Sequence, residues 1–180
     1  MKSLYIAAMM TGLLVQGGCA SSPLASGTAP TRMPLDEARF YQGVWYEIGR
    51  PRMWLTNGCV AGATEYRRLD ARQVRVRDTC RQGGPQGKER AITGAGYILD
   101  PGTNTQLRVR YFGVVRWEYR VLDHDEGYTW FISTNPSFEK LWIYTRDPSP
   151  PQILITELTR RASAFGYDTS LLEFPDAPFR

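Results

Sequence analysis

The chain has 180 residues, with 22 Lys and Arg against 18 Asp and Glu and a formal net charge of +4, and this length fits one domain. Its basic residues are scattered among acidic ones and form no run, which gives a nucleic-acid-binding function little support. One histidine and three cysteines cannot form a standard structural zinc site unaided. The many Tyr and Trp residues suit strands and a cavity lined with aromatic rings. We therefore expect one globular domain without a metal or other cofactor.

The N-terminus has the composition of an export signal followed by a tether. An apolar run over 4–15 follows Lys2, and it has signal-peptide length and is too short to span a bilayer. Small residues then precede Cys19, as in the lipobox of bacterial lipoproteins, although Gln16 stands where that pattern prefers Leu. We expect a signal peptide over 1–18, lipidation of Cys19 and a flexible Ser-, Ala-, Thr- and Pro-rich tether over 19–34. An ordinary signal peptide cleaved close to Cys19 is the alternative.

The stretch from Tyr41 to Arg50 has the pattern of a first strand. Gly43 permits a backbone kink without a Cβ clash, and Trp45 brings a large ring that needs burial. Asp36 stands where it can cap a short helical turn just before this strand. Glu47 falls on the same face as Trp45, so its carboxylate needs a partner or a proton.

Seven further short strands follow at near-regular spacing, joined by loops of hairpin length. With the first strand, they are expected at about 44–50, 60–69, 73–81, 89–99, 106–112, 117–122, 128–134 and 140–146. Such a series favours an antiparallel meander, and closing it into a barrel removes the sheet edges. Eight strands leave room for side chains or for one small ligand. The expected fold is all-β, an eight-stranded antiparallel up-and-down β-barrel.

Cys59 and Cys80 lie almost equidistant from a turn at 70–72, so a hairpin brings them within disulfide reach. Pairing Tyr66 with Val74 sets a register one residue away from a direct match of the cysteines, which requires a bulge or a diagonal placement. An exported chain lies in an oxidising compartment, so we expect a disulfide. A free nucleophilic thiol is the alternative.

One helix is expected after the last barrel strand. Ser149 is placed as its N-cap, Pro150 fits its first position, and Gln152 completes a capping box. Its apolar stripe consists of Leu154, Leu158, Ala162 and Phe165. Gly166 is a natural stop, and a last short strand is expected over 171–174. The stripe predicts that the helix packs on the outside of the barrel.

Three motifs together resemble the lipocalin family, and most of all the bacterial lipoprotein lipocalins close to apolipoprotein D and the plant temperature-induced lipocalins. They are Gly43–Ile48, Val121–Asp125 and Leu141–Pro148, and the match covers about 35–174 in order and spacing. The second motif departs from the family's usual Thr-Asp-Tyr ending. The resemblance implies a barrel domain over 35–180 with one C-terminal helix packed outside.

The resemblance also orients the barrel. It implies that Trp45 closes the bottom with Arg146 lying across its indole, and that Gly43, Trp45 and Arg146 are structural rather than catalytic. The loops after the first, third, fifth and seventh strands would then ring the open mouth, and a Cys59–Cys80 disulfide would tie strands there.

The alternation of each strand leaves two candidate inner faces, and the resemblance selects one of them as an apolar pocket wall with a few hydroxyls. That wall consists of Thr64, Tyr66, Val74, Val76, Ala95, Tyr97, Val109, Tyr111, Tyr119, Val121, Trp142 and Tyr144. For each residue singly, core packing is the commoner role, and only the whole set indicates a pocket.

The resemblance and the pocket chemistry favour a membrane-anchored carrier or store for a lipid, such as a fatty acid or a lysophospholipid. Ala20 after the cysteine implies the outer membrane, with the protein facing the periplasm. An enzyme is the first alternative, although no Ser-His-Asp arrangement is visible and His124 falls on a turn at the closed end. A structural protein whose own side chains fill the barrel is the second, and a homodimer is left open.

Apolar residues in three mouth loops indicate either a membrane-facing rim or a lid over the pocket. They are Met53, Trp54, Leu55, Val114, Val115 and Phe138.

Overall fold

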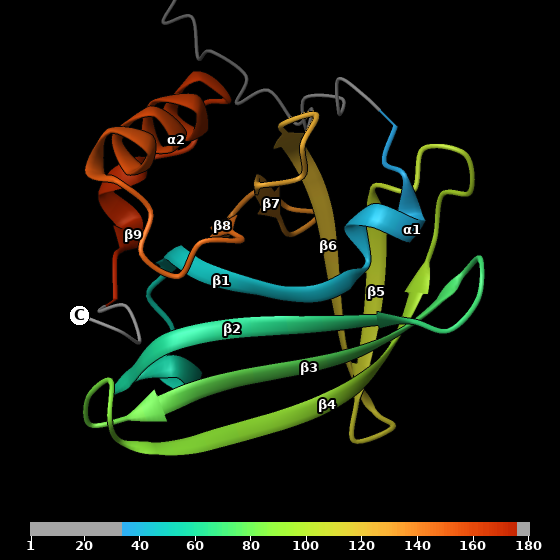
Figure 1. The fold of residues 1–180 in the computed structure, drawn as a ribbon, viewed down its shortest axis with the longest axis horizontal. Coiled ribbons are helices and arrows are strands. Elements are labelled where there is room, and N and C mark those ends of the chain that lie inside the picture. Colours follow the sequence, from blue (N-terminus) through green and yellow to red (C-terminus); the bar gives the residue numbers. More distant parts are fainter. Residues whose placement is uncertain (1–33, 176–180) are drawn as a thin grey trace, which may run out of the picture.

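The computed structural model describes residues 34–175, which form a β-barrel with a helix beside it (Figure 1). The strands are β1 (Gln42–Pro51), β2 (Cys59–Arg68), β3 (Gln73–Gln82), β4 (Lys88–Ile98), β5 (Gln106–Tyr111), β6 (Val115–His124), β7 (Trp130–Thr134), β8 (Leu141–Thr145) and β9 (Leu172–Glu173). The helices are α1 (Glu37–Phe40) and α2 (Gln152–Ala164), with 3-10 turns η1 (Trp54–Thr56) and η2 (Thr169–Leu171). The expected signal peptide, the lipidation site Cys19 and nearly all of the tether lie outside the described residues.

The strands pair in the order β2-β3-β4-β5-β6-β7-β8-β1-β9, and an additional pairing of β1 with β2 closes the first eight into a barrel. Every pairing is antiparallel, so the eight-stranded up-and-down barrel is confirmed. β9 is an extra strand that pairs with the end of β1, where Arg50 lies opposite Glu173. Each barrel strand begins and ends within two residues of its expected bounds.

The expected register of β2 and β3 is wrong by two residues, because Tyr66 lies opposite Val76 and not Val74. A bulge in β2 shifts the register between Val60 and Ala63. Beyond this bulge Cys59 lies opposite Gln82, so that Cys80 is its diagonal neighbour. The Cys59–Cys80 disulfide is confirmed, with Cα atoms 5.4 Å apart. It removes both thiols as nucleophiles.

Strand β4 turns the opposite face inward from the one expected. Ala95 and Tyr97 are exposed, and Gly94 and Gly96 face the interior instead. The cause is crowding, because a Cβ on Gly94 would lie 2.5 Å from Cγ1 of Val109 on the neighbouring strand β5. Glycine adds nothing to a hydrophobic pattern, so the alternation of the larger residues selected the wrong face.

Helix α2 begins two residues later than the capping box predicts. Its N-cap is Pro151, which makes no side-chain cap bond, and Ser149 instead belongs to a turn in which its N–H donates to Asp147 Oδ1 at 2.8 Å. A residue that precedes a proline is held extended, so Pro150 stays outside the helix because Pro151 follows it. The stop is where it was expected, since Gly166 has φ +87° directly after the C-cap.

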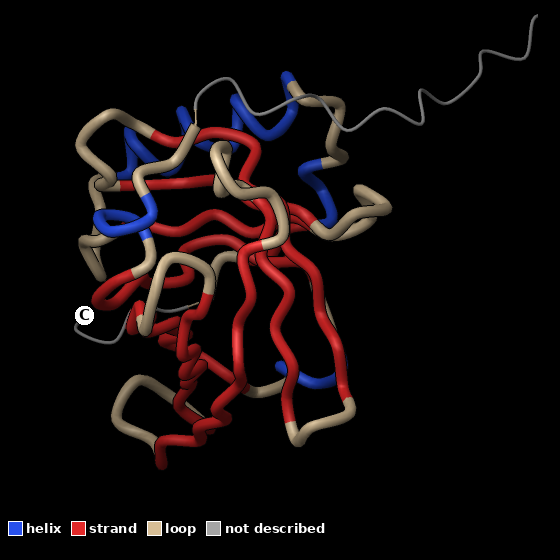
Figure 2. The backbone as a smooth tube through the Cα atoms, turned by 90° about the vertical axis from the view of Figure 1, so that its right-hand side faces the viewer, coloured by secondary structure: helices blue, strands red, loops and turns tan. Residues whose placement is uncertain are grey.

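Helix α2 packs its buried residues Leu158 and Ala162 against the outer face of the barrel, as expected. The barrel residues of this outer core are Leu122, Ile132, Leu141 and Ile143. Figure 2 shows the helix outside the strands from a second direction. Across residues 34–175, no helix combines the length and the apolar character that a membrane-spanning helix needs.

Candidate functional site

The closed end of the barrel is built around Trp45, whose side chain is fully buried. Its Nε1 donates to the carbonyl of Phe40 in α1 at 3.2 Å, which fixes the short helix beneath the barrel. The Arg146 guanidinium lies over the indole, 3.6 Å from the ring centroid, and donates to the carbonyl of Val44 at 2.8 Å. Partial burial lowers the pKa of Arg146 to about 10, so it stays charged at neutral pH. This is the contact that the sequence resemblance implies.

Most of the expected pocket-wall residues lie inside the barrel. Those that are buried or half-buried there are Thr64, Tyr66, Val74, Val76, Val109, Tyr111, Tyr119, Val121, Trp142 and Tyr144. Ala95 and Tyr97 are on the outer surface and belong to no interior site.

The enclosed cavity between these side chains measures only about 20 Å³, which is room for about one water molecule. Phe40 and Phe131 close in from below, and Phe131 stacks on Tyr144 with centroids 4.7 Å apart. The lower half of the barrel is therefore filled by its own side chains.

A hydrogen-bonded acid lies at the middle of the barrel, where sequence analysis placed no charged group. Asp78 on β3 accepts from the Thr64 hydroxyl at 2.6 Å and from the Tyr111 hydroxyl at 2.5 Å. Burial raises the pKa of Asp78, and these two hydrogen bonds oppose the rise because they favour the carboxylate. The alternation that places Val74 and Val76 inside continues to residue 78, and this was the available signal.

Buried tyrosines surround that acid. Burial is the main cause that raises the pKa of Tyr66, Tyr111, Tyr119 and Tyr144 above the usual value. Their hydroxyls therefore remain protonated at neutral pH and act as hydrogen-bond donors or acceptors. The arrangement suits binding of a polar group next to apolar surface.

Glu47 has a partner that sequence analysis could not name. Arg50, whose side chain is 4% exposed, donates to Glu47 Oε1 at 3.0 Å, to Glu173 at 2.5 Å and to the carbonyl of Cys59 at 2.6 Å. Burial raises the pKa of Glu47 to about 7, and the nearby guanidinium only partly opposes this. Residues three apart share a strand face here because β1 has an irregularity between Glu47 and Gly49.

The open end of the barrel has half-buried apolar side chains at its entrance. Met53, Ile92 and Trp117 pack against the interior core, and Lys140 Nζ lies 4.8 Å from the centroid of the Trp117 ring. These residues form the upper part of the candidate site.

Two loops at this end expose large apolar side chains. The exposed fractions are 88% for Trp54, 47% for Leu55, 76% for Phe112, 78% for Val114 and 44% for Val115. Phe112 has φ +49°, a conformation that is costly for a bulky residue, and it lies at the tip of the β5–β6 hairpin. We call these five residues the apolar rim.

Two residues that were expected in the rim are placed elsewhere. Phe138 packs on Tyr167 in the outer core under α2, with ring centroids 6.0 Å apart. Met53 is half-buried against the interior core. The rim is thus smaller than expected and rests on two loops.

The family follows from this barrel and from a match of residues 35–177 to the model of the lipocalin-like domain. The chain belongs to the lipocalin-like family. Among curated proteins, this lipocalin is 26% identical over 137 residues to the outer membrane lipoprotein Blc of Vibrio cholerae, covering 76% of the chain and 80% of the relative. It is 25% identical over 170 residues to the Blc of Escherichia coli K12, covering 94% of each protein.

Solved structures show the same fold at low sequence identity. Insecticyanin from the tobacco hornworm Manduca sexta matches with a TM-score of 0.59 at 17% identity, covering 83% of this lipocalin and 86% of that chain. Lobster apocrustacyanin A1 matches with a TM-score of 0.58 at 14% identity, covering 83% and 90%.

His124 lies at the closed end, buried and stacked on Tyr128 with ring centroids 5.0 Å apart. Within residues 34–175 of this lipocalin, no group of three His, Cys, Asp or Glu side chains is placed to hold a metal.

Proposed function

We propose that this lipocalin binds a hydrophobic ligand without chemically changing it and stores or carries it at the bacterial outer membrane. The observation that carries the proposal is the interior of the barrel, where the half-buried apolar side chains of Met53, Ile92 and Trp117 at the open end pack against a core that contains the hydrogen-bonded acid Asp78. The ligand class we favour is a fatty acid or a lysophospholipid. Each buried methylene contributes about 0.8 kcal/mol, so a long chain supplies most of the affinity.

Entry of such a chain requires movement at the open end. The enclosed space of about 20 Å³ holds no acyl chain. The half-buried Ile92 and Trp117 pack against the interior core at the open end, and their displacement would admit a chain. Lys140, at the Trp117 ring, is placed to pair with an anionic head group at the mouth.

The location is proposed from the sequence and supported by the relatives, which are named outer membrane lipoproteins. Lipidation of Cys19 would anchor the chain, and residues 19–34 would act as a tether. A flexible linker of this length reaches about 20 Å on average, which would keep the barrel close to the bilayer, on the periplasmic side proposed from the sequence.

The test is titration of delipidated full-length protein with palmitate, followed by isothermal calorimetry. Ile92→Trp adds volume to the open half and is expected to weaken binding about tenfold. Ile153→Trp is the matched control, because Ile153 is 77% exposed on α2. No binding by the parent, or equal binding by Ile92→Trp, would contradict the proposed site.

One observation favours a second function, that of a structural envelope protein with a filled barrel. The side chains that were expected to border a pocket leave room for only about one water molecule. If the delipidated protein takes up neither palmitate nor a lysophospholipid, this second function is the one to retain.

A further inference from the structure

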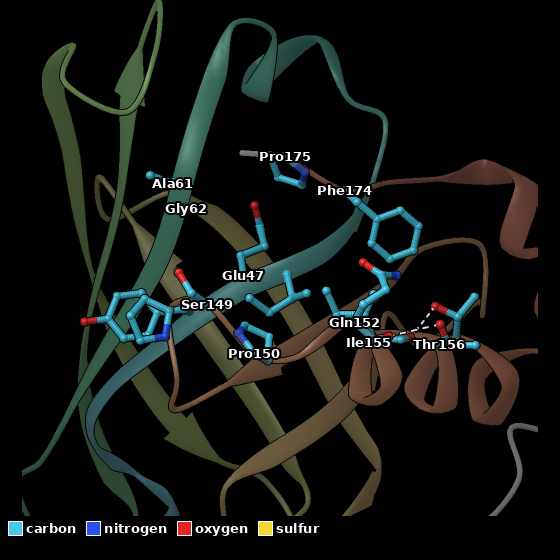
Figure 3. Close-up of a pocket in the computed structure, with 14 residues that line it drawn as sticks. Glu47, Ala61, Gly62, Ser149, Pro150, Gln152, Ile155, Thr156, Phe174 and Pro175 are labelled. Carbon is cyan, nitrogen blue, oxygen red and sulfur yellow. Dashed lines mark hydrogen bonds between the residues drawn. The ribbon is translucent and has the colours of Figure 1, made fainter. Parts of the chain in front are cut away.

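Strands β1 and β2 separate toward the open end and leave a pocket beside helix α2, outside the barrel (Figure 3). Their pairing ends where Tyr46 lies opposite Ala63. Beyond that point β2 bulges, with Ala61 at φ +52°, and β1 continues toward β9. The pocket has a volume of about 420 Å³, far more than the interior cavity and within the usual range of small-molecule sites.

The walls of this pocket are mainly apolar. Their apolar members are Tyr46, Ile48, Ala61, Pro148, Pro150, Ile155, Phe174 and Pro175. On the helix side, the hydroxyls of Thr156 and Thr159 donate to carbonyls of α2 itself at 3.0 and 2.8 Å. Most of the wall can therefore take an aliphatic chain without leaving buried polar groups unpaired.

Glu47 is the one charged residue among those that line the pocket. Its side chain is 12% exposed, and Figure 3 shows it between Ala61 and Gly62 of β2 and Ile155 of α2. Arg50 occupies Oε1, whereas Oε2 accepts no hydrogen bond from any residue in the described range 34–175. One carboxylate oxygen is thus available to a ligand.

Gly62 keeps this carboxylate accessible. Its φ is not positive, so the backbone conformation does not demand glycine at this position. The space does, because a Cβ on residue 62 would lie 2.6 Å from Glu47 Oε1. A side chain there would displace the Glu47 carboxylate from the gap between the strands.

The charges around the pocket are unbalanced toward negative. Arg50 is shared between Glu47 and Glu173, so one guanidinium faces two carboxylates. Asp78 adds a further acidic group on the interior side. A cation at the free oxygen of Glu47 would correct this excess, and the aromatic rings of Tyr46 and Phe174 in the wall also favour a cation.

We propose that this outer pocket is a second ligand site, which takes an amphiphile with a positively charged nitrogen head on Glu47 and an aliphatic tail along Ile48 and Ile155. It is separate from the barrel interior and does not depend on the ligand proposed there. An alkylamine and a phospholipid with an amine or choline head share this chemistry.

The test titrates the full-length protein with dodecyltrimethylammonium and with dodecyl sulfate, both below their critical micelle concentrations, by isothermal calorimetry. The cationic probe is expected to bind one to one, at least about tenfold more tightly than the anionic probe. Glu47→Gln is expected to weaken the cationic probe about tenfold and to leave the anionic probe unchanged. Equal affinity for the two probes would overturn the proposal.

A second variant locates the site independently of charge. Thr156→Trp fills the pocket from the exposed face of α2 and is expected to abolish binding of the cationic probe, whereas Ile153→Trp, at an exposed position that does not line the pocket, is expected to leave it unchanged. Excess palmitate, which reports on the barrel interior, is expected not to displace the probe. Unchanged binding by Thr156→Trp, or full displacement by palmitate, would place the probe elsewhere and contradict the outer site.

The pH dependence of the affinity for the cationic probe adds a third readout. Because a quaternary ammonium does not titrate, any change in affinity with pH comes from the protein. The charged groups that face Glu47 are Arg50 on β1, Asp78 on β3 and Glu173 on β9, and α2 contributes none to the pocket. Affinity for the cationic probe is expected to rise several-fold between about pH 5 and pH 8 as Glu47 ionises, and to stay flat in Glu47→Gln. A flat profile in the parent would contradict the role of Glu47. A further titration compares the affinity for dodecylamine with that for lysophosphatidylethanolamine, which distinguishes an alkylamine from a phospholipid as the source of the amine head group.

Discussion

Glu47 and Asp78 are two buried carboxylates on the barrel strands, Glu47 at the outer pocket and Asp78 in the interior, and their burial is accommodated in different ways. Asp78 is held by two hydroxyl groups, that of Thr64 on the neighbouring strand β2 and that of Tyr111 on β5, whereas Glu47 relies on one guanidinium that it shares with Glu173. Burial raises the pKa of both groups, so each binds a proton more readily in the folded than in the unfolded chain. Ionisation of these acids therefore works against the folded state.

The first prediction concerns the stability that Glu47 links to pH. The pKa of Glu47 is about 7 in the fold against an ordinary 4.5, so between these values the folded chain holds a proton that the unfolded chain has lost. The free energy of unfolding is therefore expected to fall as pH rises through this window, by about 1 to 3 kcal/mol. Urea unfolding at pH 5 and pH 8 measures it. Glu47→Gln should reduce the fall and the exposed control Glu65→Gln should not; an equal fall in all three proteins would disprove the linkage.

The second prediction concerns the closed end. Trp45→Ala is expected to lower the free energy of unfolding by about 3–5 kcal/mol, because it removes a fully buried indole and leaves a cavity. Arg146→Ala should cost less. The two losses should be non-additive because the guanidinium lies 3.6 Å from the ring centroid. A double-mutant cycle by urea unfolding measures the coupling energy. A coupling energy of zero would show that the stacking of Arg146 on Trp45 does not stabilise the fold.

At the scale of elements, sequence patterns predicted the strands and the helix, whose apolar residues repeat regularly. They failed to predict which face of a strand points inward where small residues or an irregular backbone determine it. Eight strands and one helix were predictable because apolar residues repeat at the right periods. The inner face of β4 was not, because Gly94 and Gly96 leave no hydrophobic signal. The β1 irregularity that turns Arg50 inward was hidden in the same way.

The candidate site was predictable only in outline. Alternation and family resemblance identified most of the interior residues, but the volume left between them depends on how each ring packs. The stack of Phe131 on Tyr144 is one such arrangement that no sequence period specifies. The outer pocket was missed altogether, because it requires both the bulge at Ala61 and the position of α2.

The third prediction tests the corrected face of β4 with two neighbouring positions. Gly94→Ala is expected to destabilise the protein by about 1–3 kcal/mol, since its Cβ would lie 2.5 Å from Val109. Ala95→Val, on the exposed face, should change stability by no more than about 0.5 kcal/mol. Thermal or urea unfolding compares the stability losses of the two variants. A larger loss for Ala95→Val than for Gly94→Ala would indicate that Ala95, and not Gly94, faces the interior.

At the scale of the whole molecule, the apolar rim and the N-terminal anchor would both contact the membrane. The rim residues lie on the β1–β2 loop and on the β5–β6 loop with Val115, the first residue of β6, and both loops are at the open end of the barrel. Exposed tryptophan and phenylalanine side chains at loop tips suit insertion into a lipid interface. We propose that this end faces the bilayer and that lipid enters through it, the alternative being that the loops fold over the pocket as a lid.

The fourth prediction separates the rim from the anchor. A Cys19→Ser chain carries no lipid, so its flotation with liposomes reports on the barrel alone. We expect it to float, and Trp54→Ser with Leu55→Ser in the same background to reduce flotation several-fold through lost apolar contact. Ile153→Ser on α2 is the matched control. Absence of flotation by the Cys19→Ser chain, or equal flotation by the double variant, would leave only the anchor to hold the protein at the membrane.

The most direct test of ligand binding is native mass spectrometry of the full-length protein isolated from the envelope of its own host. We expect a one-to-one adduct with the mass of a long-chain lipid, which extraction removes and added fatty acid or lysophospholipid restores. A bare protein mass that no long-chain amphiphile shifts, before or after extraction, would contradict the binding function and leave a filled barrel.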